Sequence, residues 1–199
     1  FALAPALGNG AEAGLKTDLA GGQLTAAVFR VSTHDEIVSA GSAGGRATFR
    51  NAGRTRRDGV ELGWSAAFAR HGRAQLAYTW LDARYRDDGA GSIRAGNRIP
   101  GIARQSAYAA LGWAPPQGWQ AGIEARYLSR LYADDANDAA APGYVVAALS
   151  AGYVKRLGDW DLSAYARVDN LFDRRYAGSV IVNESNGRYY EPAPGRSVG

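Results

Sequence analysis

The sequence predicts an all-β fold, an antiparallel transmembrane β-barrel of which this chain forms a partial barrel. We expect a meander of hairpins with short periplasmic turns and long extracellular loops. Three observations predict this fold. Apolar and polar residues alternate with a period of two along several runs, the connections between the runs are alternately short and long, and Trp residues lie beside the short connections.

The composition permits this fold and excludes several others. The chain has 199 residues, 46% of them hydrophobic, with no Cys and no Met. The absence of Cys excludes disulfide scaffolds, thiolate metal sites and cysteine nucleophiles. The longest apolar runs are far shorter than the ~20 residues that a membrane-spanning helix needs. The net charge of +4 is spread over the chain, so no nucleic-acid partner is expected.

Alternation defines the predicted strands. It is clearest in three runs, whose apolar positions are Val60, Leu62, Trp64, Ala66 and Phe68; Trp119, Ala121, Ile123, Ala125 and Tyr127; and Trp160, Leu162, Ala164, Ala166 and Val168. Weaker runs cover roughly 13–19, 24–31, 74–84, 104–113 and 144–154. Because the period is two, each run predicts a strand with one apolar and one polar face. We expect about eight to ten strands in all.

The connections between the runs sort into two classes. Short turns are predicted at 20–22, 71–73, 115–118 and 156–159, and long polar stretches near 32–47, 85–103, 132–143 and 171–188. Each short turn joins two runs, so the chain is predicted to form four consecutive hairpins. Short turns on one side and long loops on the other are typical of outer-membrane barrels.

Aromatic residues lie where the predicted strands would leave a bilayer. Trp113 and Trp119 bracket one short turn, Trp160 follows another, and Phe68 precedes a third. An aromatic girdle at the membrane interface would place them there. The same residues could instead close the core of a soluble sandwich, but the two loop classes favour the barrel.

Four local motifs carry a resemblance to a known family. They are Asn51-Ala52-Gly53 with Gly59-Val60-Glu61-Leu62, then Ile99-Pro100-Gly101, then Asn170-Leu171-Phe172-Asp173 with Tyr176, and finally Pro194-Gly195-Arg196. In this order and spacing, the chain resembles the TonB-dependent outer-membrane receptors of the siderophore-receptor type. Physical roles for these residues are structural. Gly59 is expected to relax a bending strand, and Pro100 to mark a strand start or edge.

The resemblance implies a function and a place in the cell. It implies a receptor that takes up ferric siderophores through the outer membrane of a Gram-negative bacterium. Outer-membrane lipid and lipopolysaccharide would be its surroundings, and a TonB system would act through a plug domain. Nothing in residues 1–199 resembles that plug, and a barrel that encloses one has about 22 strands. We therefore expect a C-terminal part of a barrel domain whose final strand is truncated.

Catalysis is not expected from this sequence. The two histidines, His34 and His71, fall at opposite ends of the predicted strands, so they form neither a metal pair nor a catalytic triad. The acidic run 134–138 lacks the Gly and the bidentate Glu of a calcium loop. No enzyme activity, metal or cofactor is predicted.

Ligand binding is instead expected from the long loops. Guanidinium and phenol groups suit an anionic, oxygen-rich ligand such as a ferric siderophore. The candidates are Arg84, Tyr85, Arg86, Arg94, Arg98, Arg130, Tyr132, Arg188 and Tyr189. Such residues could equally contact lipopolysaccharide phosphates or stay solvated.

Two other functions remain open at this point. One is a small, complete outer-membrane barrel with a structural or adhesive role. The other is a soluble β-sandwich that binds carbohydrate through exposed Trp and Tyr residues.

Overall fold

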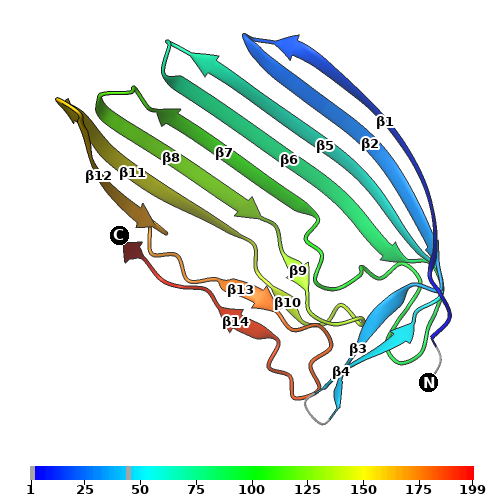
Figure 1. Ribbon diagram of the computed structural model, residues 1–199. Coiled ribbons are helices and arrows are strands. Elements are labelled where there is room, and N and C mark those ends of the chain that lie inside the picture. The colour runs from blue at the N-terminus through cyan, green and yellow to red at the C-terminus, as the bar shows by residue number, and fades with distance from the viewer. Residues whose placement is uncertain (1–2, 44–45) are drawn as a thin grey trace.

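The computed structural model describes residues 3–43 and 46–199, and its main feature is one curved antiparallel sheet (Figure 1). Nine strands form this sheet in the order β1-β2-β5-β6-β7-β8-β11-β12-β15. They are β1 (Leu7–Leu19), β2 (Gly22–His34), β5 (Thr55–Phe68), β6 (Gly72–Tyr85), β7 (Gln105–Trp113), β8 (Gly118–Leu128), β11 (Tyr144–Leu157), β12 (Trp160–Asp169) and β15 (Ser197–Val198). Among these residues, no helix is long and apolar enough to cross a membrane.

The predicted segregation of the connections is confirmed. The short turns lie together at one end of the sheet and the long loops at the other (Figure 1). Three long loops contain hairpins that the sequence did not predict. These are β3 (Ile37–Ala43) with β4 (Arg46–Asn51), β9 (Leu131–Tyr132) with β10 (Ala140–Ala141), and β13 (Ala177–Val180) with β14 (Tyr190–Pro192).

One short turn lies two residues earlier than predicted. The chain reverses at 69–71, where Ala69 and Arg70 adopt positive φ, and Gly72 already belongs to β6. The aromatic ring of Phe68 explains the position, because a Cβ on Gly72 would lie 2.3 Å from it. The glycine therefore makes room for a ring on the neighbouring strand and is not a turn residue.

The register confirms the predicted apolar face. Leu62 of β5 pairs with Tyr78 of β6, and Leu111 of β7 pairs with Ile123 of β8, so their side chains lie on one face. Along β5 to β8 this face has no charged residue between the short turns and Asp58. On β5 the band runs from Val60 to Phe68, about 26 Å along the strand. At a tilt of about 40°, this length spans about 20 Å across the membrane, somewhat less than the ~25 Å apolar band of outer-membrane barrels.

The aromatic residues mark both borders of the band. Trp119 and Trp160 are 72% and 75% exposed, beside the short turns as predicted. At the opposite border lie Tyr78 and Trp80, which the sequence analysis did not name, and Tyr127, which it gave only as an apolar strand position. The second border was missed because those residues lie inside alternating runs rather than next to a turn.

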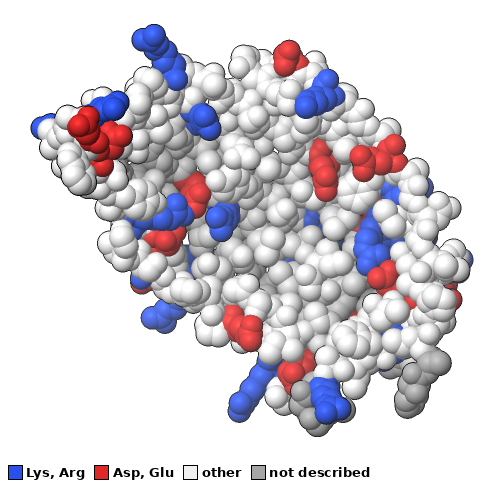
Figure 2. Space-filling model, in the orientation of Figure 1, with Lys and Arg blue, Asp and Glu red and all other residues white. Residues whose placement is uncertain are grey.

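The other face of the sheet is polar. It carries Glu61 and Glu124 near mid-strand and Arg126 and Arg167 nearer the loop ends. Figure 2 shows acidic and basic side chains scattered among uncharged ones over the middle of the sheet. A charged inner face opposite an outer face with an apolar band is the arrangement of a barrel wall in a bilayer.

The sheet is an open wall, as expected for a partial barrel. Its end strands, β1 and β15, are not neighbours, and β15 pairs with β12 through only two residue pairs. The described strands form no second large sheet packed against the first, so the soluble sandwich considered above is wrong. They also do not close into a small barrel.

A small apolar core lies where the loops fold against the inner face. Ala83 and Tyr85, at the loop end of β6, are buried together with Ala52, Ile93 and Ile99 of the loops. Because inner-face strand residues form one side of this core, the long loops cover the inner face instead of extending away from it.

The motif residues near the C-terminus have structural roles. The Asn170 side chain accepts a hydrogen bond from the Arg174 N–H at 2.8 Å and donates one to the Arg174 carbonyl at 2.9 Å. Asp173 accepts from the Arg196 N–H at 2.9 Å, which joins two of the recognised motifs. Tyr176 stacks against Tyr144, with ring centroids 4.1 Å apart.

The remaining motif residues have local structural causes. Asn51 donates to the carbonyl of Asp35 at 2.7 Å, while Gly53 and Gly101 adopt positive φ. Gly59 has a different cause from the one expected, because a Cβ there would lie 2.2 Å from the Phe29 ring. Pro100 is buried in the loop before β7 and does not open the strand itself, which begins at Gln105.

Candidate functional site

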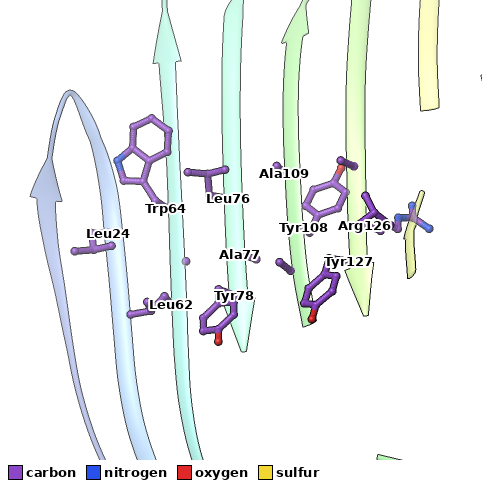
Figure 3. A pocket seen from close by; sticks show the side chains of 14 residues that line it. Leu24, Leu62, Trp64, Leu76, Ala77, Tyr78, Tyr108, Ala109, Arg126 and Tyr127 are labelled. Atoms are coloured by element: carbon purple, nitrogen blue, oxygen red, sulfur yellow. The ribbon is translucent and has the colours of Figure 1, made fainter. Parts of the chain in front are cut away.

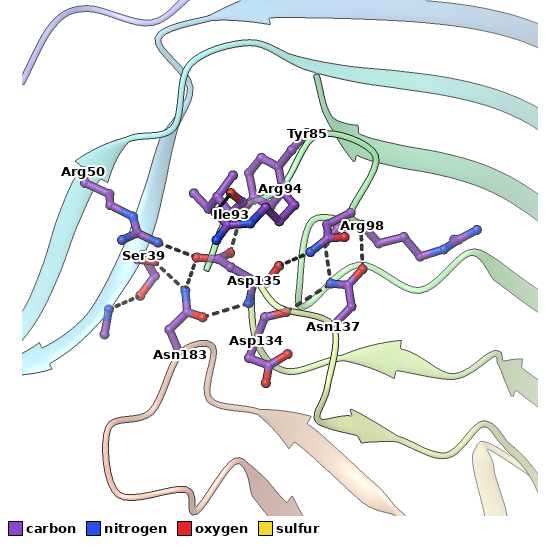
Figure 4. Close-up of polar contacts among 12 residues, drawn as sticks. Ser39, Arg50, Tyr85, Ile93, Arg94, Arg98, Asp134, Asp135, Asn137 and Asn183 are labelled. Atoms are coloured by element: carbon purple, nitrogen blue, oxygen red, sulfur yellow. Dashed lines mark hydrogen bonds and ion pairs between the residues drawn. The ribbon is translucent and has the colours of Figure 1, made fainter. Parts of the chain in front are cut away.

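A buried carboxylate joins three of the long loops to the loop end of β6 (Figure 4). Asp135, between β9 and β10, accepts a hydrogen bond from the Tyr85 hydroxyl at 2.6 Å on Oδ1. Its Oδ2 accepts from Arg50 of β4 at 2.7 Å and from Asn183, between β13 and β14, at 3.0 Å. The Asp135 side chain is 1% exposed. We call Asp135, Tyr85, Arg50 and Asn183 the loop hub.

Asn183 binds three loops to one another. Its Nδ2 also donates to the Ser39 carbonyl at 2.8 Å, and its Oδ1 accepts from the Asp135 N–H at 3.1 Å. Its own N–H donates to the Ala133 carbonyl at 2.9 Å. Asn183 has a positive φ of 56°, a conformation that Asn tolerates better than most residues.

Two further Asn residues connect neighbouring loops through the backbone. Asn97 Nδ2 donates to the Asp135 carbonyl at 2.8 Å. Asn137 accepts from the Arg98 N–H at 2.7 Å and donates to the Arg98 carbonyl at 2.9 Å. The loops that follow β6 and β8 are therefore held in one arrangement.

The chemistry of the loop hub is structural. A buried carboxylate is stable only when it is paired and hydrogen-bonded, and three side-chain donors meet that need here. Within the described ranges, no group of three or more His, Cys, Asp and Glu residues is placed to hold a metal ion. The hub therefore fixes the shape of the surface that the loops present.

The structure separates the predicted ligand-binding residues into four groups. Tyr85 is fully buried in the hub, where its hydroxyl is already used. Arg84 and Arg98 both form ion pairs with Asp82, at 2.8 and 3.2 Å, on the side of β6 that carries the apolar band. In Figure 4 the Arg98 guanidinium points away from Asp135.

The third group is exposed on the loops. Arg86, Arg94 and Arg188 are exposed, and Tyr189 is half-buried. The Arg94 guanidinium donates only to the carbonyl of Ile93, at 3.1 Å. In the part of the chain that the structure describes, the Arg86 and Arg188 side chains have no polar partner. These side chains are free to contact a ligand.

Arg130 and Tyr132 form a pair of their own. The Arg130 guanidinium lies 5.3 Å from the centroid of the Tyr132 ring and donates to its hydroxyl at 3.2 Å. The Tyr132 carbonyl accepts from the Gly101 N–H at 2.8 Å. The structure does not bring this pair into the loop hub.

An exposed ion pair joins two of the loops near the hub. Arg54 donates to Asp87 through its side chain at 2.6 Å and through its backbone N–H at 3.0 Å. These hydrogen bonds lower the pKa of the Asp87 carboxyl to about 2. The carboxylate therefore stays ionised far below neutral pH.

The inner face carries a separate polar network. Glu124 of β8 forms an ion pair with Arg167 of β12 and accepts from the Tyr108 hydroxyl at 3.1 Å. Arg167 also binds Asp169 at 2.8 Å, and Arg126 lies 3.6 Å from Glu124. This network crosses the wall from β8 to β12, where it lines one pocket with Asn170 and Pro194 of the last loop.

The sequence analysis missed the members of the hub other than Tyr85. It treated the acidic run containing Asp135 only as a possible calcium loop. Asn183 and Ser39 lie 144 positions apart, and Arg50 and Asp135 lie 85 apart. The spacing of residues along the sequence does not indicate contacts over such separations, so they become visible only in the folded structure.

Comparisons with known proteins agree with the fold. A family model described as TonB dependent receptor-like, beta-barrel matches residues 1–171. The ferrioxamine B receptor of Salmonella typhimurium is 30% identical over 189 residues, a match that covers 89% of this chain and 26% of that protein. The probable TonB-dependent siderophore receptor PiuA of Acinetobacter baumannii is 28% identical over 185 residues, covering 88% and 23%.

Solved structures show the same architecture. The crystal structure of the siderophore receptor PiuA from Acinetobacter baumannii matches with a TM-score of 0.76 at 28% identity, over 96% of this chain and 27% of that one. The ferric yersiniabactin uptake receptor FyuA from Yersinia pestis matches with a TM-score of 0.77 at 24% identity, over 97% and 29%, which shows the fold alone. The chain spans about a quarter of the length of the curated relatives it matches.

Proposed function

The chain belongs to the TonB-dependent receptor β-barrel family, and from that membership we propose that it is part of an outer-membrane receptor that takes up ferric siderophores. Two relatives are named for this activity, the ferrioxamine B receptor and the siderophore receptor PiuA. Uptake would depend on a TonB system acting through a plug domain. The chain would supply a C-terminal part of the barrel domain, in the outer membrane of a Gram-negative bacterium, surrounded by its lipid and lipopolysaccharide.

One observation of this chain carries the proposal. A single buried carboxylate, Asp135, ties three of the long loops to the loop end of β6 over the inner face. The exposed guanidiniums of Arg86, Arg94 and Arg188 are thereby held on a fixed surface. A prearranged set of cations reduces the entropy lost when an anionic chelate binds.

The test is ligand binding by the full-length receptor in detergent. We expect a ferric hydroxamate or another ferric chelate to quench Trp fluorescence, and the metal-free chelator to bind more weakly. R94Q/R188Q is expected to weaken binding at least about tenfold, since charge-assisted hydrogen bonds would be lost. R70Q/R73Q, with the same charge change at the short-turn end, serves as the control. Absence of binding to every ferric chelate class, with the receptor folded, would contradict the proposal.

A further inference from the structure

The chain contains two Asn-Gly pairs, and the fold places them in opposite surroundings. Asn186-Gly187 lies in the connection between β13 and β14, in an exposed turn at the loop end of the molecule (Figure 1). Asn9-Gly10 lies inside β1. Asparagine is chemically labile, and a following glycine has no Cβ to hinder an attack by its own backbone nitrogen. The two pairs therefore share one chemistry and differ in conformation.

The turn folds the Asn186 side chain back over the Gly187 peptide. Asn186 Oδ1 accepts a hydrogen bond from the Arg188 N–H at 2.8 Å, which closes an Asx turn. The Gly187 N–H donates to the Glu184 carbonyl at 3.2 Å, at the long end of the range for such bonds. Asn186, Gly187 and Arg188 are all exposed. The Gly187 nitrogen is therefore open to water and weakly held beside the side-chain amide of Asn186.

This arrangement suits the closure of a cyclic imide. The Gly187 nitrogen loses its proton to water and forms a bond to Cγ of Asn186, while the C–N bond of the side-chain amide breaks and ammonia leaves. The Arg188 N–H stabilises the negative charge that develops on Oδ1. Water then opens the imide at either carbonyl and yields aspartate or isoaspartate. Overall, water is consumed and ammonia released, and no oxidant or reductant is needed.

Asn9-Gly10 is held in the opposite way. β1 pairs with β2 along its whole length, Asn9 with Ser32 and Gly10 with Val31. Asn9 belongs to the outer face of the sheet, on which neighbouring strands run side by side (Figure 3). Ring closure there requires ψ of Asn9 to leave the extended region and the ladder to open. The pair in β1 is therefore expected to react at least about tenfold more slowly than the pair in the turn.

The position of the turn gives the modification an effect on the loop surface. Asn186 comes three residues after Asn183 of the loop hub and two before Arg188. Among the described residues, the Arg188 guanidinium has no polar partner. A carboxylate at position 186 competes with a ligand anion for this guanidinium. The isoaspartate product also lengthens the main chain between the hub and Arg188 by one methylene group.

We propose that Asn186-Gly187 is a site of spontaneous deamidation, and that its conversion to aspartate or isoaspartate lowers the affinity for an anionic ferric chelate. The site depends only on the turn, whereas its effect on binding rests on the proposed function. Because the ammonia is lost, the conversion is not reversed, and affinity falls with the age of a receptor molecule.

The first test follows deamidation by peptide mass spectrometry of the full-length receptor in detergent, incubated at mildly alkaline pH. Asn186 is expected to convert to both products, faster at higher pH, and at least about tenfold faster than Asn9. In receptor unfolded in guanidinium chloride the two rates should converge, because only the fold distinguishes the pairs. N186Q, which keeps the amide but forms the ring far less readily, should remain unmodified at this position.

The second test measures chelate affinity. N186D is expected to weaken binding of an anionic ferric chelate by about two- to fivefold, as an exposed ion pair with Arg188 would. N9D, which makes the same change at the other pair, is the matched control and should bind as wild type does. In an R188Q background, N186D should have little further effect, because its target is already absent. Incubated N186Q should keep its affinity while incubated wild type loses it.

The outcomes separate this inference from the proposed function. No product at Asn186, or equal rates at the two pairs in the folded receptor, would overturn the site. N186D that binds the chelate as tightly as wild type would overturn the effect on binding. Freshly prepared, folded receptor that binds no ferric chelate while Asn186 deamidates ahead of Asn9 would overturn the proposed function and support the site.

Discussion

The carboxylate of Asp135 accepts hydrogen bonds from three side chains of other segments while being almost completely buried. Removing the charge leaves Arg50 without its counter-ion, and Arg50 is itself only 26% exposed. A broken ion pair of this kind costs more than the loss of one neutral hydrogen bond. The hub is therefore the point at which one substitution affects all four loops.

We predict that D135N loosens the loops without unfolding the sheet. Amide hydrogen exchange in the segments 35–54, 86–104, 129–143 and 170–196 of the full-length receptor should accelerate together. Y85F should have a smaller effect, about 2 kcal/mol, because it removes a single hydrogen bond to the carboxylate. D138N, in the same loop but exposed, is the control. Acceleration confined to residues 129–143 would show that the hub does not couple the loops.

A second prediction concerns the pH dependence of the contact between Arg54 and Asp87. The pKa of Asp87 is lowered from 3.8 to about 2 by hydrogen bonds from Arg54, so ionisation favours the folded contact. The contribution is fully present above about pH 4 and disappears as pH falls towards 2. The Arg54 amide should stay protected from exchange at pH 3.5 and lose protection near pH 2. In D87N this pH dependence should be absent; its persistence would contradict the assignment.

At the scale of the strand, adjacent residues of β7 belong to opposite environments. Ala109 pairs with Leu76 on the outer face, and Ala110 pairs with Gln75 on the inner face. The two positions have the same side chain in the same strand. A comparison of these two positions therefore measures the effect of the outer against the inner face of the sheet.

We predict that A109R destabilises the barrel and A110R does not. An Arg on the lipid face near mid-membrane costs about 2–4 kcal/mol, whereas at position 110 it faces the polar side near Glu124. The measurement is the free energy of unfolding of the full-length receptor in lipid vesicles, titrated with denaturant. Equal destabilisation by both variants would contradict the assignment of position 109 to the lipid face and of position 110 to the inner face.

The strands were predictable because their determinants are local. Alternation along 119–127 gives both the strand and its faces, and two adjacent glycines and an alanine mark the turn at 20–22. The loop hairpins β9–β10 and β13–β14 have no such pattern, being only two to four residues per strand. Long-range contacts hold their loops in place, such as the Tyr85 hydroxyl on Asp135 and the Asn183 N–H on the Ala133 carbonyl.

The candidate site was predictable only in part. Residue type correctly suggested that Arg and Tyr gather at the loop end, but it could not sort them. Arg84 and Tyr85 are adjacent in sequence, yet one pairs with Asp82 on the outer face and the other lies in the loop hub, because a strand alternates its faces. Whether a face of the strand meets lipid or the long loops depends on the curvature of the whole sheet and on where the loops fold.

At the scale of the molecule, the nine strands form a wall with two open edges. Among the described residues, β1 pairs only with β2, and β15 pairs only with β12. Unpaired strand edges are costly in lipid and promote association in water. The wall is therefore expected to be stable within a larger closed barrel. This agrees with the comparisons, in which the chain covers about a quarter of each relative's length.

The central claim is that this wall separates lipid from a polar interior, and spin labelling along β8 tests it most directly. The chain contains no Cys, so each substitution at 119–127 adds one labelling site to it. In the full-length receptor in bilayers, labels at 119, 121, 123, 125 and 127 should be accessible to oxygen dissolved in lipid. Labels at 120, 122, 124 and 126 should be shielded from it. Accessibility without a two-residue period, or with the even positions facing lipid, would contradict the account.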